Sequence, residues 1–173
     1  YNLLIRWYKH ILLVGKDKEL EYISSKLSGN TAIDIGSNIG FYSYVMSKKY
    51  KNVMSFEPIA NVSQFLKDAE IENIQIYNYA LSNKDEKSKI YLPKLYGSYQ
   101  HAYAGLDLNK RNDDYISLDI KTKPLDSFKF ENVDLIKIDV EGHEISVLEG
   151  ARKTIYENSP IMILELEERH KKG

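Results

Sequence analysis

The stretch T-A-I-D-I-G-S-N-I-G, from Thr31 to Gly40, decides the fold class of this chain. A short apolar run ends in a turn with glycines at 36 and 40, and the apolar and aromatic residues over 40–50 have helical spacing. This order predicts a buried strand, a tight turn and a helix, which form one repeat of an α/β fold. Glycine in such a turn lets the backbone approach a ligand closely.

The turn does not have the spacing that holds a pyrophosphate. Dinucleotide-binding turns follow G-x-G-x-x-G, and counting from Gly36 puts Asn38 and Phe41 at the second and third glycine positions. The turn instead starts with Asp34, an acid that can hold the ammonium group of a ligand directly or through water. Glu57 follows the next predicted strand, where an acid can accept hydrogen bonds from both ribose hydroxyls. Together these residues predict a nucleoside-containing ligand without phosphate.

Strands and helices alternate outward from this turn. Strands are predicted over 31–35, 52–56, 74–81, 133–140 and 160–166, and helices over 3–12, 17–27, 40–50 and 145–158, with one more that starts at Pro58. This alternation predicts a mostly parallel sheet covered on both faces, a three-layer sandwich. We expect residues 1–30 to form a helical segment packed on a single domain over 31–173, and we favour an edge-covering helix over 3–12 rather than one that lies on a membrane.

Residues 82–128 interrupt the alternation. Residues 90–92 and 115–121 have the character of extra strands, and the segment between them, 94–114, is rich in tyrosine, glycine and asparagine. A loop of this length in a compact domain is usually functional or disordered. Two interpretations therefore remain for this insertion: a lid over an acceptor site, or a disordered segment.

The fourth predicted strand ends in K-I-D-V-E-G-H-E, residues 137–144. The two-residue period of a strand puts Lys137, Asp139 and Glu141 on one side. Ligands of open α/β sheets bind beyond the carboxyl ends of the strands, so this cluster shares an edge with the glycine turn and its acids. The alternative is structural: a Lys137–Asp139 ion pair, with Glu141 and Glu144 stabilising the start of the next helix.

Composition narrows the classes of function. The chain has 173 residues, 43% of them hydrophobic, which suffices for one domain with a substantial core. Its net charge of -1 argues against a nucleic-acid partner or an anionic membrane surface. The absence of cysteine excludes disulfides and thiolate metal sites and permits a reducing compartment. No apolar run approaches the roughly 20 residues that span a bilayer. We therefore expect a cytoplasmic protein; the sequence does not predict an oligomeric state.

Four stretches resemble the FkbM family of S-adenosylmethionine (SAM)-dependent methyltransferases, which have the class I, Rossmann-like fold. They are T-A-I-D-I-G-S-N-I-G-F-Y-S, S-F-E-P, N-Y-A-L-S and L-I-K-I-D-V-E-G-H-E-I-S-V-L-E-G-A. The resemblance runs from about Thr31 to Glu167. It implies an O-methyltransferase that acts on a hydroxyl of a sugar or secondary metabolite, so that the acceptor is a small molecule or glycan and the product of SAM is S-adenosylhomocysteine.

The resemblance also implies which residues bind SAM. They lie in the glycine turn, after the second strand, in the third strand and at the end of the fourth: Asp34, Gly36, Ser37, Asn38, Gly40, Phe41, Glu57, Pro58, Ala80, Leu81 and Asp139. The superfamily fold usually continues past its fifth strand with a helix and an antiparallel hairpin. The sequence reaches Gly173 soon after that strand, so we expect an incomplete C-terminal hairpin.

Methyl transfer to a hydroxyl needs a base, which contributes about 10²–10⁴-fold. His143 is the first candidate because of its unperturbed pKa, followed by Asp139 and Glu141. As a lone histidine near a helix start, His143 has the alternative of no catalytic role. Asp139, Glu141 and Glu165 are also oxygen ligands that Mg²⁺ accepts, although we favour a site without metal.

Two other classes of function stay open. One is a degenerate SAM-fold module that binds without catalysis, and the other is a nicotinamide-dependent oxidoreductase on the same fold. The glycine spacing of the turn disfavours the oxidoreductase, because that enzyme must bind a pyrophosphate. The row of acids Asp34, Glu57 and Asp139 disfavours the degenerate module.

Overall fold

The computed structural model describes residues 18–95, 98–99, 104–106 and 114–165. The predicted helix over 3–12 and most of the segment 94–114 lie outside the described residues. The elements, in chain order, are α2 (Lys18–Lys26), β1 (Gly29–Ile35), α3 (Phe41–Ser47), β2 (Tyr50–Phe56), α4 (Ala60–Lys67), β3 (Ile74–Tyr77), β4 (Ala80–Leu81), β5 (Glu86–Leu95), β6 (Ser98–Tyr99), β7 (Tyr115–Lys123), the 3₁₀ helix η2 (Leu125–Phe128), β8 (Val133–Ile138), α5 (Glu144–Gly150), α6 (Arg152–Asn158) and β9 (Ile161–Leu164).

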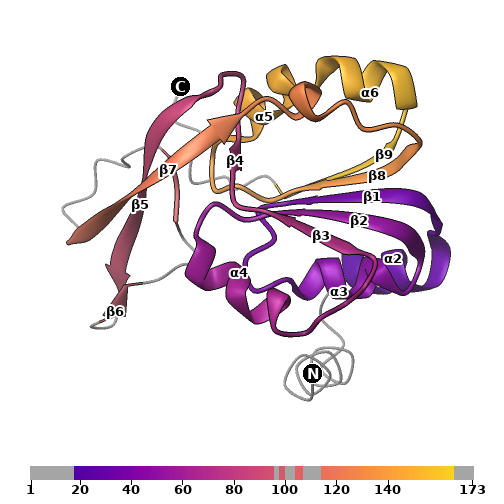
Figure 1. The fold of residues 1–173 in the computed structure, drawn as a ribbon, viewed down its shortest axis with the longest axis horizontal. Helices are drawn as coiled ribbons and strands as arrows, with labels where there is room; N and C mark the ends of the chain where they lie inside the picture. The colour runs from indigo at the N-terminus through magenta and orange to yellow at the C-terminus, as the bar shows by residue number, and fades with distance from the viewer. Residues whose placement is uncertain (1–17, 96–97, 100–103, 107–113, 166–173) are drawn as a thin grey trace.

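A five-stranded sheet forms the centre of the molecule. Its strand order is β3-β2-β1-β8-β9, and every neighbouring pair is parallel. Helices α2, α3 and α4 lie on one face of this sheet, and α5 and α6 lie on the other (Figure 1). The predicted α/β three-layer sandwich with a mostly parallel sheet is therefore confirmed.

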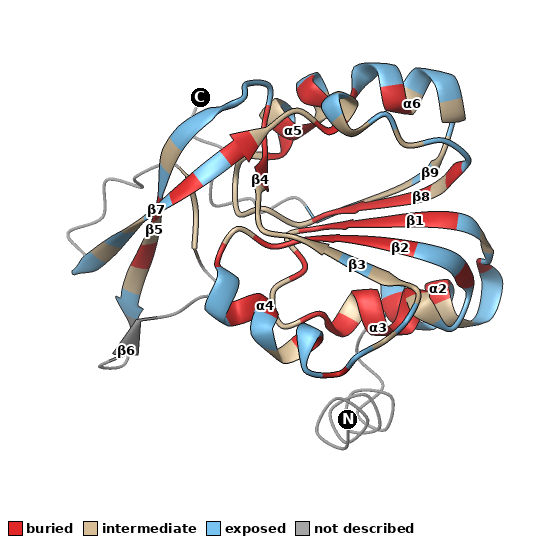
Figure 2. Ribbon diagram, viewed as in Figure 1, coloured by how far each residue is buried: buried red, intermediate tan, exposed pale blue. Residues whose placement is uncertain are grey.

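Strand β1 shows how both faces of the sheet are buried. Ala32 packs in a core cluster with residues of α2 and α3, whereas Ile33 and Ile35 pack in a second cluster with residues of α5. Figure 2 shows β1, β2 and β8 as almost continuously buried strands. Because successive side chains point to opposite faces, Asp34 lies on the same face as Ala32, toward α3.

The insertion forms a second sheet with the order β4-β7-β5-β6. Strands β5 and β7 pair antiparallel along most of their lengths, from Glu86 opposite Thr122 to Pro93 opposite Tyr115. The extra strands predicted at 90–92 and 115–121 are thus confirmed and extend further. In Figure 1 this sheet lies at the left, beside the carboxyl ends of the parallel strands. The insertion is therefore next to the edge where a ligand is expected.

Two predicted elements are broken in the structure. The strand predicted over 74–81 ends at Tyr77, because Asn78 turns inward and donates its amide hydrogens to Glu57 O and Ser63 Oγ, both within 2.9 Å. The strand resumes as β4, which joins the second sheet. The helix predicted over 145–158 is two helices that meet at Ala151, which has the non-helical angles φ -113° and ψ 5°.

The end of β8 also differs from the prediction. The strand stops at Ile138, and Glu141 has a left-handed φ of 50°. The prediction that Lys137, Asp139 and Glu141 share one side requires an extended backbone over 137–141. Because the chain turns after Ile138, the two-residue period of the strand does not continue to Glu141. Lys137 is buried on the α3 face, next to Asp34 of β1 in the sheet register.

Candidate functional site

A cavity of about 90 Å³ lies at the carboxyl edge of the parallel sheet. The turn after β1, the end of β2, strand β4, the turn after β8 and the segment 104–106 of the insertion form its walls. Nine of the predicted site residues line it: Gly36, Asn38, Glu57, Pro58, Ala80, Leu81, Asp139, Glu141 and His143. Segments far apart in the sequence therefore meet at one site.

Gly36 allows two turns to meet at the cavity. Its φ is +78°, and a Cβ atom there would lie 1.8 Å from the carbonyl oxygen of Asp139. No side chain fits in that space, so any residue other than glycine would push the turn after β1 away from the turn after β8. Asn38 also has a left-handed φ, 51°, which asparagine tolerates better than most residues.

Glu57 is the acid at the end of β2, and its side chain is only 7% exposed. Its Oε2 accepts the backbone N–H of Asn38 at 3.1 Å, and its Oε1 accepts that of Ile59 at 2.9 Å. Burial raises the pKa of Glu57 to about 7; the two N–H donors lower it, and the nearby Asp34 adds to the rise. Each carboxylate oxygen accepts one backbone donor here and has capacity for another hydrogen bond.

Asp34 does not line the cavity, although the sequence predicted a ligand contact there. Its carboxylate is fully buried beneath α3, where Ser43 Oγ donates to Oδ2 at 2.6 Å. Oδ1 has no hydrogen-bond partner among the described residues. Burial raises the pKa of Asp34, and the neighbouring Lys137 opposes that rise. The Asp34 carboxylate lies on the α3 side of the sheet, away from the cavity. Successive side chains of a strand point to opposite faces, so Asp34 points away from the face of Ile35, which does line the cavity.

Three more predicted residues of the turn lie outside the cavity walls: Ser37, Gly40 and Phe41. Ser37 Oγ lies 2.8 Å from Ser55 Oγ, in a buried row of hydroxyls that continues to Ser43. Phe41 packs in the core beneath α3. These residues belong to the turn and the start of α3, and none of them brings a side chain to the cavity.

Asp139 forms an ion pair and also lines the cavity. Lys137 Nζ donates to its Oδ2 at 2.9 Å, and Lys137 is 3% exposed, with its ammonium 4.3 Å from the centre of the Tyr42 ring. The structural ion pair is therefore present. Asp139 is nevertheless about one-third exposed and lines the cavity, so the ion pair does not remove it from the cavity wall.

His143 lies directly before α5 and lines the cavity. Its Nε2 is 3.0 Å from the hydroxyl of Ser82, a buried residue just after β4. This contact holds the imidazole ring at the cavity wall. Ser82 was not among the predicted site residues, although it ends the stretch N-Y-A-L-S that contributed to the family resemblance.

Apolar side chains form the rest of the cavity wall, and none of them was among the predicted site residues. They are Ile35, Phe56, Tyr79, Ile90, Ala104, Leu106 and Val140. Ile35, Phe56 and Val140 directly precede or follow predicted site residues, so their positions at strand ends were the signal available. No local pattern indicates Ile90, Ala104 or Leu106, because they reach the cavity only through the folding of the insertion.

Glu165, the third residue of the metal alternative, has a backbone role in the structure. Its N–H donates to Ile138 O at 3.0 Å, and it does not line the cavity. Within the described ranges no three His, Asp or Glu side chains are grouped closely enough to hold a metal ion. None of the helices that the structure describes has the length and apolar character needed to cross a bilayer.

Comparison with known proteins identifies the family. The model of the methyltransferase FkbM domain matches residues 34–173. The chain belongs to the FkbM methyltransferase family. A curated relative, Methyltransferase 1 of Beauveria bassiana (strain ARSEF 2860), is 28% identical over 68% of this chain. The chain spans 57% of the length of that relative.

Two solved structures superpose on this chain. Methyltransferase FkbM from Methylobacillus flagellatus KT superposes with a TM-score of 0.55 at 19% identity, covering 79% of this chain and 32% of that one. An rRNA methylase from Streptococcus thermophilus superposes with a TM-score of 0.46 at 15% identity, covering 80% and 61%. The first of these likenesses shows that the FkbM domain described here has the class I methyltransferase fold.

The charged side chains that line the cavity of this FkbM domain are acidic. Its charged walls are three carboxyls, those of Glu57, Asp139 and Glu141, and no lysine or arginine among the described residues lines it. A pyrophosphate would meet repulsion on several sides in such a place. A ligand with cationic groups and hydroxyl donors would instead be stabilised.

Proposed function

We propose that this FkbM domain binds SAM and transfers its methyl group to a hydroxyl oxygen of a sugar or secondary-metabolite acceptor. The acidic lining of the cavity carries the proposal, because SAM has a sulfonium, an ammonium and ribose hydroxyls but no phosphate. Membership of the family supports methyl transfer as the reaction. The same lining argues against a nicotinamide-dependent oxidoreductase, whose cofactor contains a pyrophosphate.

The residues present fit SAM group by group. Glu57 accepts the ribose hydroxyls with the hydrogen-bond capacity that its two backbone donors leave. Ala80 and Leu81 of β4 form an apolar wall for the adenine. Asp139 faces the cavity from the opposite side and attracts the ammonium group. Gly36, which has no side chain, leaves the backbone of the turn open to the methionine part of the ligand.

The insertion closes part of the cavity. The cavity of about 90 Å³ is smaller than the roughly 300–1,000 Å³ of typical ligand sites. Ala104 and Leu106 form part of its wall, and their segment is joined to β5 by two backbone hydrogen bonds between Gly105 and Tyr91, of 2.9 and 3.1 Å. An outward shift of this short segment would enlarge the cavity. This arrangement supports the interpretation of the insertion as a lid.

Bound SAM supplies an electrophilic methyl group, whose bond to sulfur breaks as the bond to the acceptor oxygen forms. His143 takes the hydroxyl proton in this proposal, with its ring oriented by Ser82. A positioned base contributes about 10²–10⁴-fold. Glu57 and Asp139 would fix the methyl donor at two points, and alignment of a fixed donor with the acceptor is the larger source of acceleration.

Calorimetric titration with SAM, S-adenosylhomocysteine and NADH tests the proposal. We expect SAM or S-adenosylhomocysteine to bind, and Glu57→Ala to weaken binding about 10- to 100-fold, the loss expected for hydrogen bonds to a charged group. Glu131→Ala is the matched control, since Glu131 is an exposed acid outside the cavity. Binding of NADH, or SAM binding that is indifferent to Glu57→Ala, would contradict the proposal. SAM binding without turnover on any glycan or phenol acceptor would favour the non-catalytic module.

A further inference from the structure

A second hollow adjoins the cofactor cavity and has the opposite charge. It encloses about 840 Å³ and shares Pro58, Tyr79 and Leu106 with the cavity. Its charged lining residues are three lysines and one aspartate, a net charge of +2: Lys87, Lys89, Lys121 and Asp119. The whole chain has a net charge of -1, so this positive charge is a local feature.

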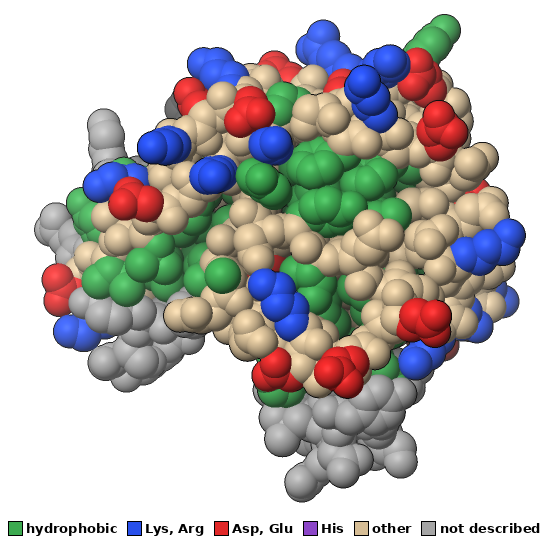
Figure 3. Space-filling model, in the orientation of Figure 1, with side chains coloured by type: hydrophobic (Ala, Val, Ile, Leu, Met, Phe, Trp, Pro, Cys, Tyr) green, Lys and Arg blue, Asp and Glu red, His purple; other side chains and the backbone are tan. Residues whose placement is uncertain are grey.

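The register of the β5–β7 pair gathers the lysines on one face. Lys87 lies opposite Lys121, and Lys89 lies opposite Asp119. Directly opposite residues of an antiparallel pair share a face, so all four side chains belong to the same side of the hairpin. The other side bears Ile90 among its residues and is buried against the insertion's core. Figure 3 shows basic side chains over this hairpin on the viewed face.

Among the described residues, no ion pair involves Lys87, Lys89 or Lys121, and Asp119 opposite Lys89 offsets only one of their three charges. Like charges directly opposite each other destabilise a strand pair, as is the case for Lys87 and Lys121. The ion pairs found among the described lysines involve Lys94, Lys123, Lys137 and Lys153 instead. The net charge of +2 in the hollow therefore favours an anion, which would relieve the repulsion between Lys87 and Lys121.

We propose that this hollow binds the phosphate group of a phosphorylated sugar acceptor. The inference rests on the proposed function, since it names the class of acceptor for the same reaction. Three ammonium donors can surround the oxygens of one phosphate. Tyr79 and Tyr91 line the hollow, and Tyr79 belongs to the wall shared with the cofactor cavity. A phosphate held at the lysines thus places its sugar next to the reacting methyl group.

Glucose 1-phosphate is the probe, followed by amide chemical shifts in NMR at low salt, with glucose and gluconate as comparisons. We expect shifts confined to β5, β7 and the residues of the shared wall. The triple variant Lys87→Gln, Lys89→Gln, Lys121→Gln is expected to weaken binding about tenfold or more. The control is the triple variant Lys18→Gln, Lys49→Gln, Lys153→Gln, which removes the same charge at exposed positions outside the hollow and should leave binding within about twofold.

Several results would overturn the inference: no binding of glucose 1-phosphate, an equal loss in both triple variants, or equal binding of glucose or gluconate. SAM titration of each variant separates this inference from the proposed function. If the hollow variant binds SAM normally and the native chain does not bind glucose 1-phosphate, the phosphate site is refuted and the cofactor proposal stands. If SAM does not bind while glucose 1-phosphate binds at the lysines, the proposed function fails and the anion site remains.

Discussion

Glu57 is a buried acid at the cavity, and its ionisation costs stability. The carboxyl is almost fully buried, and two backbone N–H groups do not replace all of its lost hydration. Burial raises its pKa from 4.5 to about 7, so the folded protein holds this proton more tightly than the unfolded chain does. The contribution of Glu57 to stability is therefore fully present below about pH 4.5 and is lost as the pH rises through about 7.

Glu57→Gln should remove this pH dependence. A glutamine is neutral at every pH, so the variant gains stability relative to the native chain as the pH rises. We expect that gain to be roughly 2 kcal/mol larger at pH 8 than at pH 5. Urea unfolding at both pH values measures it, with the exposed Glu131→Gln as a control for the loss of one charge. An equal stability difference at the two pH values would show that Glu57 does not titrate in this range.

Substitution of His143 should lower the rate of turnover without changing the affinity for SAM. Because we assign it to the acceptor's proton, His143→Ala is expected to lower the rate of S-adenosylhomocysteine formation about 10²-fold or more and to leave SAM affinity unchanged. Ser82→Ala should cause a smaller loss and a shifted pH profile, since Ser82 orients the ring through a 3.0 Å contact. The exposed Ser127→Ala is the matched control. Near-normal turnover of His143→Ala would exclude it as the base.

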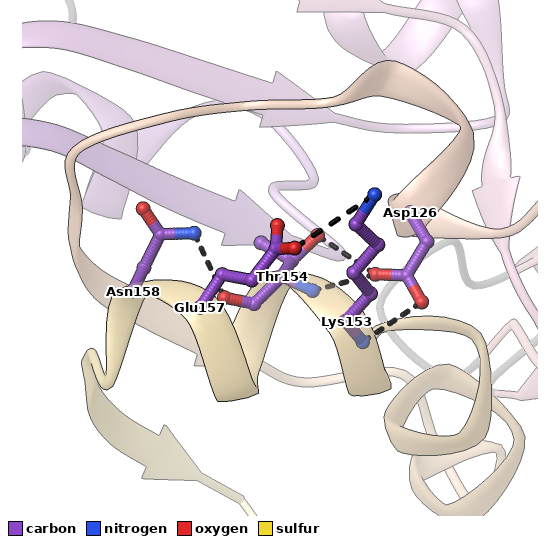
Figure 4. A network of polar contacts seen from close by, with 5 residues as sticks. All are labelled: Asp126, Lys153, Thr154, Glu157 and Asn158. Atoms are coloured by element: carbon purple, nitrogen blue, oxygen red, sulfur yellow. Dashed lines mark hydrogen bonds and ion pairs between the residues drawn. The ribbon is translucent and has the colours of Figure 1, made fainter.

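At the scale of elements, the break between α5 and α6 depends on contacts that the local sequence does not reveal. Gly150 ends α5, and a Cβ atom there would lie 2.0 Å from Ser82 O, so the helix meets the chain after β4 without a side chain between them. The first turn of helix α6 lies next to the carboxylate of Asp126 in η2 (Figure 4). Oδ1 accepts the N–H and the hydroxyl of Thr154, both at 2.8 Å, and Oδ2 accepts the N–H of Lys153 at 3.0 Å.

Asp126 thus caps α6 from another segment of the chain. Asp126→Ala leaves the first N–H groups of the helix without their acceptor, and we expect the free energy of unfolding to fall by about 1–2 kcal/mol. Asp85→Ala is the control, because that exposed acid has only a 3.8 Å ion pair with Lys123 and should cost less than about 1 kcal/mol. Urea unfolding compares them. Equal losses in the two variants would mean that the cap adds no more than a surface ion pair.

At the scale of the whole molecule, two hollows of opposite charge share one wall. The parallel sheet brings Glu57 and Asp139 to the acidic cavity, and the hairpin of the insertion brings Lys87 and Lys121 to the basic hollow. Their arrangement suits a cationic donor and an anionic acceptor that meet at the shared wall. Neither sheet contains this arrangement alone, since the wall combines Pro58 and Tyr79, which follow β2 and β3, with Leu106 of the insertion.

Sequence patterns were a good guide to the order of elements and to most of the cavity. The strand–turn–helix unit over 31–50 and the acid at Glu57 are local features, and the structure has both at the expected edge. The sequence was a poorer guide to where a strand or helix is interrupted. Over 74–81 the apolar pattern continues through Asn78, and only the hydrogen bonds of its side chain to β2 and α4 show that the strand ends before it.

The sequence by itself determined the fold class, the edge of the sheet that carries the site and the family, because strand–helix alternation and short motifs are properties of neighbouring residues. Tertiary structure alone decided which acids line the cavity. The period of β1 separates Asp34 from Ile35, but a strand buried on both faces gives no sign of which face borders the cavity. Tertiary structure also decided that Lys87 lies opposite Lys121, since strand register depends on contacts between residues far apart in the chain.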